Sequence, residues 1–172
     1  MIQSLAGEIG SLLKSQKLTL GAVESATGGL ISHLITNVSG SSDYFQGSIT
    51  SYSNEIKVKL IGVKTETLKK HGAVSAQVAR EMARGGRNVL NTDICIADTG
   101  IAGPNGATAA KPIGLFYFGL SHSSGTFARK QVFHGNREQN KELAAVAALS
   151  WVKEYLSILK KQANVNNKDH DK

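Results

Sequence analysis

The chain has 172 residues, a length that accommodates one domain with a buried core. Hydrophobic residues make up 41% and charged residues 19%, which excludes an intrinsically disordered chain. No apolar run approaches the roughly 18 residues that a membrane-spanning helix needs, and the first residues lack the pattern of a signal peptide. We therefore expect a cytoplasmic protein without a membrane partner. Cys95 is the only cysteine, which excludes a disulfide framework and a multi-cysteine zinc site.

The net charge of +7 comes from 20 basic and 13 acidic residues. These basic residues are scattered along the chain, and aromatic residues make up only 6% of it. A protein that stacks on single-stranded nucleic acid would carry more rings, and one that binds duplex DNA would carry a denser basic face. We therefore do not expect nucleic acid as the main partner, and a small phosphorylated ligand accounts for the charge equally well.

The first half of the chain alternates helical and strand patterns. Its expected elements are an amphipathic helix over 2–16, a buried strand over 18–23, a helix over 30–38, a strand over 46–53, a short helix capped by Asn54, and a short helix from Thr65 that ends before Gly72. Ser75 then suits the N-cap of a helix over 76–90, although the pair Gly85 and Gly86 weakens the middle of that helix.

The second half begins with a nearly continuous apolar strand over 93–100, which is typical of the centre of a sheet. A glycine-rich loop follows, then two strands over 113–121 and 126–133 that form a hairpin, then a helix over 138–161. This order predicts one α/β domain with a mixed sheet over residues 1–162. We expect the polar tail at 163–172 to be disordered.

Small polar residues gather where strands end or helices begin. The clusters lie at 25–29, at Ser41 and Ser42, at 99–106 and at 135–137. Turn formation alone selects such residues, but ligands of open α/β sheets also bind beside such turns, and backbone N–H groups there attract phosphate.

Several common catalytic signatures are absent from the chain. It contains no GxxxxGK[ST], no GxGxxG and no GxSxG, and no two histidines have metal-ligand spacing on one helix. We therefore expect no metal and no cofactor. Without a serine–histidine–acid set, a nucleophile would need a lysine base whose pKa is lowered. Lys57 fits that role because it follows a strand and Tyr52, whereas Lys59 is the alternative if it points inward instead.

These residues, taken in order, resemble a known family. The matching motifs are Glu24-Ser25-Ala26-Thr27-Gly28-Gly29, Gly40-Ser41-Ser42, Tyr52-Ser53-Asn54-Glu55 with Lys57, His71-Gly72-Ala73-Val74-Ser75, Thr99-Gly100-Ile101-Ala102-Gly103-Pro104, Lys111-Pro112-Ile113-Gly114 and Gly135-Asn136-Arg137-Glu138. Over about residues 3–160 the chain closely resembles the C-terminal domain of the competence/damage-inducible protein CinA, which also exists as a stand-alone nicotinamide mononucleotide amidohydrolase. The resemblance implies a three-layer α/β/α sandwich and a homo-oligomer, most simply a dimer.

The implied reaction is hydrolysis of the carboxamide of nicotinamide mononucleotide to nicotinate mononucleotide and ammonia, as part of pyridine nucleotide recycling. By motif position, the resemblance makes Ser42 the nucleophile and Lys57 its general base, with Tyr52 and Ser25 orienting groups or relaying protons. Ser25 is the alternative nucleophile because it sits at a strand-to-helix turn. The substrate-binding residues implied by the resemblance are Thr27, Gly28, Gly29, Thr99, Gly100, Gly103 and Arg137, the glycine-rich turns supplying N–H donors and Arg137 helping to lower the pKa of Lys57.

The chain departs from the family pattern at three places. Ala26 replaces a cysteine, Asp98 replaces a small or apolar residue, and residues 105–110 replace a loop richer in glycine and acids. A carboxylate at Asp98 that faced the site would raise the pKa of Lys57. Three alternatives therefore stay open: a silent paralogue that binds a pyridine nucleotide without turnover, a nucleic-acid-associated protein, and an amidase or phosphate-ester hydrolase with another substrate.

Overall fold

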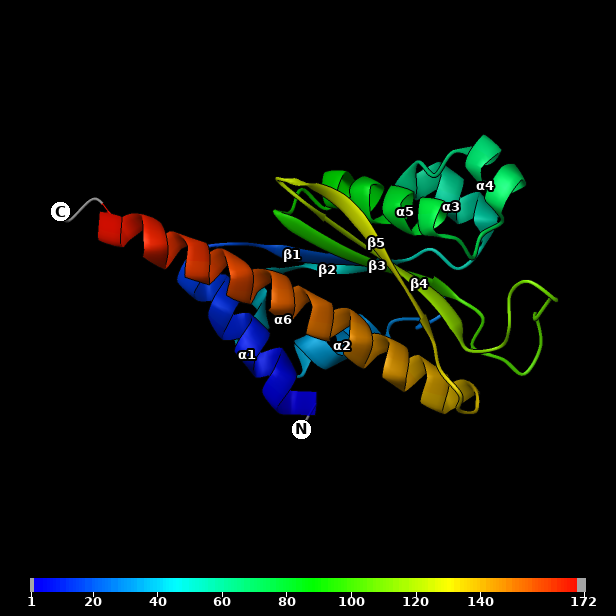
Figure 1. The fold of residues 1–172 in the computed structure, drawn as a ribbon, viewed down its shortest axis with the longest axis horizontal. Coiled ribbons are helices and arrows are strands. Elements are labelled where there is room, and N and C mark those ends of the chain that lie inside the picture. Colours follow the sequence, from blue (N-terminus) through cyan, green and yellow to red (C-terminus); the bar gives the residue numbers. More distant parts are fainter. Residues whose placement is uncertain (1, 170–172) are drawn as a thin grey trace.

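The computed structural model describes residues 2–169 of the chain. A five-stranded sheet in the order β2-β1-β3-β4-β5 lies between two layers of helices (Figure 1). Its strands are β1 (Leu20–Glu24), β2 (Phe45–Thr50), β3 (Ile94–Gly100), β4 (Leu115–His122) and β5 (Gly125–Val132). β1 pairs in parallel with β2 and β3, whereas β3, β4 and β5 pair antiparallel. The predicted three-layer fold with a mixed sheet is confirmed.

The helices divide into two groups that cover opposite faces of the sheet (Figure 1). One layer contains α1 (Ile2–Gln16), α2 (Leu30–Thr36) and α6 (Arg137–Asp169), and the other contains α3 (Asn54–Ile61), α4 (Thr65–His71) and α5 (Ala76–Val89). A short 3₁₀ turn, η1 (Ser41–Asp43), precedes β2. Since α6 continues to Asp169, residues 163–169 are helical where the sequence analysis expects disorder; residues 170–172 lie outside the described part.

The central strand β3 shows why both helical layers are needed. Its side chains alternate between the two faces: Ile94 and Ile96 pack toward α1, α2 and α6, and Cys95 and Ala97 pack toward α5. All four side chains are buried. A strand with two apolar faces is stable only when both are covered, and this explains its continuous apolar sequence.

Local capping sets where the helices of the second layer begin. Ser75 accepts a hydrogen bond from the Val78 N–H and caps α5, as predicted. The N-cap of α3 is Ser53, whose hydroxyl accepts from the Ile56 N–H, so the prediction of Asn54 was wrong by one residue. Asn54 instead begins the helix, and it lines the small cavity described below.

The glycines of α5 bring that helix close to its neighbours. A Cβ at Gly85 would lie 1.9 Å from the carbonyl oxygen of Ile61, and one at Gly86 would lie 2.1 Å from a methyl of Val23. Two adjacent glycines predict a weak point in the middle of the helix, because the intrinsic helix propensity of glycine is low. Close packing on α3 and β1 offsets that cost, so α5 runs through both residues without a break.

We expect Gly119→Ala to destabilise the domain by about 3 kcal/mol, because overfilling a packed contact costs energy of this order. A Cβ at Gly119 on β4 would lie 2.0 Å from the carbonyl oxygen of Ala79 on α5. The matched control is Gly7→Ala in α1, where a Cβ meets no described atom within 4 Å. Chemical denaturation measures both variants; equal midpoints would contradict the close packing of β4 on α5.

Candidate active site

The candidate site lies where the three parallel strands end. Ser25 directly follows β1, Lys57 lies on α3 just after β2, and Thr99 is near the end of β3. In the sheet, β2 lies next to β1 on one flank and β3 lies next to β1 on the other, so the order of strands reverses direction at β1. Ligands of open α/β sheets bind at such a switch point, outside the carboxyl ends of the strands.

Lys57 and Ser25 form a buried pair at this point. The Lys57 side chain is only 1% exposed, and its Nζ lies 2.9 Å from the Ser25 Oγ. The same Nζ lies 2.6 Å from the carbonyl oxygen of Ser51 and 3.2 Å from that of Tyr52. A neutral amine has two hydrogens and one lone pair. When these two hydrogens are donated to the two carbonyls, the lone pair is left to accept the proton of Ser25.

Burial favours this neutral form of Lys57. Removal of the amine from water lowers the pKa of Lys57 below its ordinary value of 10.5, and Asp98 would oppose this in part if it were ionised. Arg137 is not the cause, contrary to the sequence-based expectation. A buried lysine that can lose its proton and faces a hydroxyl is a candidate general base.

The pair opens onto a cavity of about 190 Å³. The cavity is lined by Ser25, Ala26, Tyr52, Asn54, Lys57, Ala73, Val74, Thr99, Gly100, Ala102 and Arg137. Ala102 and Arg137 also line a wider pocket of about 700 Å³, which continues to Pro104, Ile113 and Lys141. The two cavities are therefore adjacent, with Ala102 and Arg137 in the wall of each.

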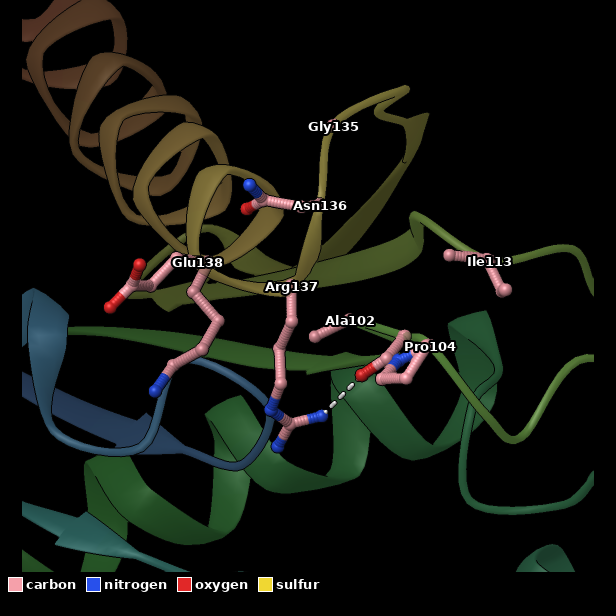
Figure 2. A pocket seen from close by; sticks show the side chains of 9 residues that line it. Ala102, Pro104, Ile113, Gly135, Asn136, Arg137 and Glu138 are labelled. Atoms are coloured by element: carbon pink, nitrogen blue, oxygen red, sulfur yellow. Dashed lines mark hydrogen bonds between the residues drawn. The ribbon is translucent and has the colours of Figure 1, made fainter.

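Arg137 stands between the two volumes. Figure 2 shows its guanidinium extending toward the loop that carries Ala102 and Pro104, where its Nη1 donates to the carbonyl oxygen of Gly103 at 2.7 Å. Its Nη2 also donates to the Tyr52 hydroxyl at 3.3 Å. These two hydrogen bonds hold Arg137 beside the cavity. Gly103 has a φ of 94°, a conformation that favours glycine, and it precedes a cis peptide bond to Pro104.

Asp98 lies directly beneath the turn that carries Ser25. It is fully buried and accepts hydrogen bonds from the N–H groups of Ser25, Ala26 and Thr27 at 3.0, 2.9 and 3.2 Å. Burial raises the pKa of Asp98 to about 6. Ala26 contributes its backbone N–H to this arrangement, a donor that does not depend on the side chain at that position.

The structure brings most of the predicted site residues together, with one important exception. Ser25, Lys57, Tyr52, Thr99, Gly100 and Arg137 line the small cavity, and Gly103 lines the adjoining pocket. Lys59 is exposed, so Lys57 is the inward-facing lysine. Ser42 is also exposed and lies in η1, before β2 begins.

This position separates Ser42 from Lys57 within the chain. β1 and β2 are parallel, and Leu20 pairs with Phe45 at the end of the sheet that carries Ser42. The five residues of β1 separate that end from Ser25, a distance of roughly 16 Å at about 3.3 Å per residue. The prediction that Ser42 pairs with Lys57 is therefore corrected to Ser25.

The turn at 27–29 also differs from the expectation. The N–H of Thr27 donates to Asp98, and the N–H of Gly29 donates to the buried carboxylate of Glu24. These two donors are therefore not available to a substrate. Gly28 and Gly29 do not line the small cavity; they line a surface pocket with His33 and Lys141, and Lys141 also lines the wider pocket.

Three residues near the site were not predicted to have a catalytic or binding role. Asn54 and Ala73 line the cavity, and Ala73 fixes Thr99 by accepting a hydrogen bond from its hydroxyl at 2.9 Å. Asn140 is buried and donates to the carbonyl oxygens of Ala102 and Gly135, which ties the loop after β3 to the start of α6. A polar residue on an otherwise apolar helical face is the sequence signal for Asn140.

Neither a metal cluster nor a membrane span is found among the residues described. Within 2–169, no three side chains of His, Cys, Asp or Glu gather closely enough to hold a metal ion. Over the same residues no helix combines the length and apolar character needed to cross a bilayer.

Comparison with known proteins identifies the family. The family model of the CinA C-terminal domain matches residues 2–156. This chain belongs to the CinA C-terminal domain family. It is 47% identical over 146 residues to a putative competence-damage inducible protein of Moorella thermoacetica, covering 85% of this chain and 35% of that protein. A CinA-like protein of Chloroherpeton thalassium is 46% identical over 157 residues, covering 89% and 37%. The chain thus spans little more than a third of these curated relatives.

Solved structures of CinA proteins share the fold over nearly their whole length. The competence/damage inducible protein CihA of Agrobacterium tumefaciens has a TM-score of 0.87 at 33% identity, covering 91% of this chain and 95% of that one. The competence damage-inducible protein A of Klebsiella pneumoniae has a TM-score of 0.88 at 28% identity, with coverage of 91% and 97%. The CinA fold therefore exists in chains of about this size.

Proposed function

We propose that this chain hydrolyses the carboxamide of nicotinamide mononucleotide to nicotinate mononucleotide and ammonia. The observation that supports it most is the buried Lys57 amine, whose Nζ lies within hydrogen-bond distance of the Ser25 hydroxyl and of two carbonyl oxygens. An amide carbon is a poor electrophile, so its hydrolysis needs an activated nucleophile of this kind.

The proposed reaction proceeds in two steps. Ser25 Oγ attacks the carboxamide carbon while its proton passes to Lys57 Nζ. The tetrahedral intermediate collapses, the carbon–nitrogen bond breaks, and Lys57 returns the proton to the leaving nitrogen, which departs as ammonia. Water then attacks the acyl group on Ser25 with Lys57 as base, and nicotinate mononucleotide leaves as Ser25 regains its proton.

The side-chain donors of the cavity suit the charge that develops on the carboxamide oxygen. Tyr52, Asn54 and Arg137 line the cavity, and Arg137 is already oriented by Gly103 and Tyr52. Donors that are fixed before the reaction stabilise an oxyanion without reorganisation. The adjoining pocket offers room for the ribose phosphate, and its lining has two basic residues, Arg137 and Lys141, against one acidic residue, Glu138.

A substrate panel tests this proposal. Purified protein is incubated with nicotinamide mononucleotide, nicotinamide riboside or free nicotinamide, and ammonia is measured together with the carboxylate product. We expect equal amounts of ammonia and nicotinate mononucleotide from the mononucleotide and much slower release from the other two. A raised melting temperature with no turnover would replace the proposal by a silent binder, and turnover of another amide would replace the substrate.

The rate should depend on pH through Lys57. Below its pKa the amine is an ammonium and cannot accept the Ser25 proton, so kcat/KM should rise with pH as Lys57 loses its proton. Because burial lowers that pKa, the midpoint of the rise should lie below 10.5. A pH profile of kcat/KM measures the midpoint; a rate that falls as Lys57 deprotonates would contradict a lysine base.

A further inference from the structure

Two buried carboxylates share one hydroxyl beneath the proposed nucleophile. Glu24, Thr27 and Asp98 are each 0% exposed. Thr27 Oγ1 lies 2.7 Å from Glu24 Oε2 and is also within hydrogen-bond distance of Asp98 Oδ1. Both contacts are short, and no surface water can separate groups that are completely buried.

The hydroxyl of Thr27 has one hydrogen, so it can donate to only one of the two carboxylates. If both were ionised, the other contact would bring two oxygens together with no hydrogen between them, in a place where unpaired buried charge is costly. The two contacts are both satisfied when one carboxyl group is protonated. That group donates to Thr27, and Thr27 donates to the other carboxylate.

The hydrogen bonds around each carboxylate indicate where the proton resides. Glu24 accepts from four other donors: the N–H groups of Gly29, Ile31 and Ser32 and the Ser32 hydroxyl. Asp98 accepts from three other donors: the N–H groups of Ser25, Ala26 and Thr27. The negative charge is therefore better stabilised on Glu24, which also lies at the start of α2.

The electrostatic environment of Asp98 favours its acid form, although a pKa of about 6 alone would leave most of the group ionised at neutral pH, so the shared Thr27 hydroxyl carries the assignment. Burial raises the pKa of Asp98 to about 6, and the charge of Glu24 acts in the same direction. If the Thr27 hydroxyl donated to Asp98, it would lower the pKa of Asp98. When Thr27 donates to Glu24, its oxygen accepts the proton of Asp98, and this contact stabilises the acid form of Asp98. Lys57 on α3 is the other charged group that interacts with Asp98. On the neighbouring strand β4, Asp98 is paired with Phe118, which carries no charge.

We propose that Asp98 is a neutral positioning residue: it donates its proton to Thr27, Thr27 donates to Glu24, and this chain of hydrogen bonds fixes the turn that carries Ser25. Its carboxyl oxygens still accept the three N–H groups of the turn. The catalytic consequence rests on the proposed function. An ionised Asp98 would favour the ammonium form of Lys57, whereas a neutral Asp98 leaves Lys57 free to act as a base.

Infrared spectroscopy tests the protonation state without any need for turnover. At neutral pH exposed carboxyl groups are ionised, so a buried acid gives a separate carbonyl band. We expect this band in the wild type, a shift of the band when aspartate is labelled with ¹³C at the side-chain carboxyl, and its loss in Asp98→Asn. The control Asp93→Asn, at the exposed opposite end of β3, should keep it. No band, or a band that the label does not shift, would overturn the proposal.

Kinetics of the same variants test the positioning role. In Asp98→Asn the new amide presents a donor to Thr27 and an acceptor to the N–H groups of Ala26 and Thr27, but the bond from the Ser25 N–H is lost. We expect a several-fold decrease in kcat, with the midpoint of the pH profile unchanged because no charge has been removed. A midpoint moved to lower pH would show that Asp98 was ionised and overturn the proposal. If the wild type releases no ammonia while the labelled band shifts, the proposed function fails and the assignment of the proton stands.

Discussion

Ser25→Ala should reduce ammonia release from nicotinamide mononucleotide by at least about 10³-fold, because it removes the attacking oxygen. The Ser25 hydroxyl contacts Lys57, whereas the turn itself is held by backbone N–H groups on Asp98. The variant should therefore fold normally and still bind the nucleotide. Initial rates and a nucleotide-dependent melting temperature measure the two effects separately.

Ser42→Ala is the matched control for this experiment. Ser42 is exposed and lies at the opposite end of the parallel strands from Lys57, so its loss should change the rate by less than about twofold, as is usual for a surface substitution. An inactive Ser42→Ala protein beside an active Ser25→Ala protein would contradict the geometry of the site.

Lys57→Met should reduce kcat by about 10³-fold, within the range expected for a lost general base. Methionine approximates the length and volume of the lysine stem, so it can occupy the same buried position. Lys57→Arg should be equally inactive, because the guanidinium stays protonated and cannot accept a proton from Ser25. Initial rates of ammonia release measure both, and the exposed Lys59→Met is the control with unchanged activity.

Activity retained in Lys57→Arg would show that Lys57 supplies positive charge and not a base. Activity retained in Lys57→Met would show that Lys57 supplies neither. Both results would contradict the interpretation of the Nζ contacts with Ser25, Ser51 and Tyr52.

The order of elements could be predicted from the sequence because local signals carry it. The apolar run of β3 and the Ser75 cap of α5 depend on neighbours in sequence, and both were confirmed. The end of α6 was not predictable in this way. The polar residues at 163–169 give no apolar stripe, yet they continue a helix whose earlier turns are anchored in the core.

The site was predictable in its composition but not in its arrangement. Lys57 stands out as a lysine after a strand, but the choice between Ser25 and Ser42 depends on which end of a parallel sheet each occupies. That information comes from strand pairing between distant segments. The glycine-rich turn at 27–29 has the composition of an anion site, and no local signal shows that Glu24 and Asp98 take its Gly29 and Thr27 N–H groups.

The most direct test of the Ser25–Lys57 mechanism is mass spectrometry of protein quenched with acid during turnover of nicotinamide mononucleotide. The mechanism predicts an added mass equal to the nicotinate ribotide acyl group, present in the wild type and in Ser42→Ala and absent in Ser25→Ala. An acyl group that remains in Ser25→Ala, or that disappears in Ser42→Ala, would contradict it.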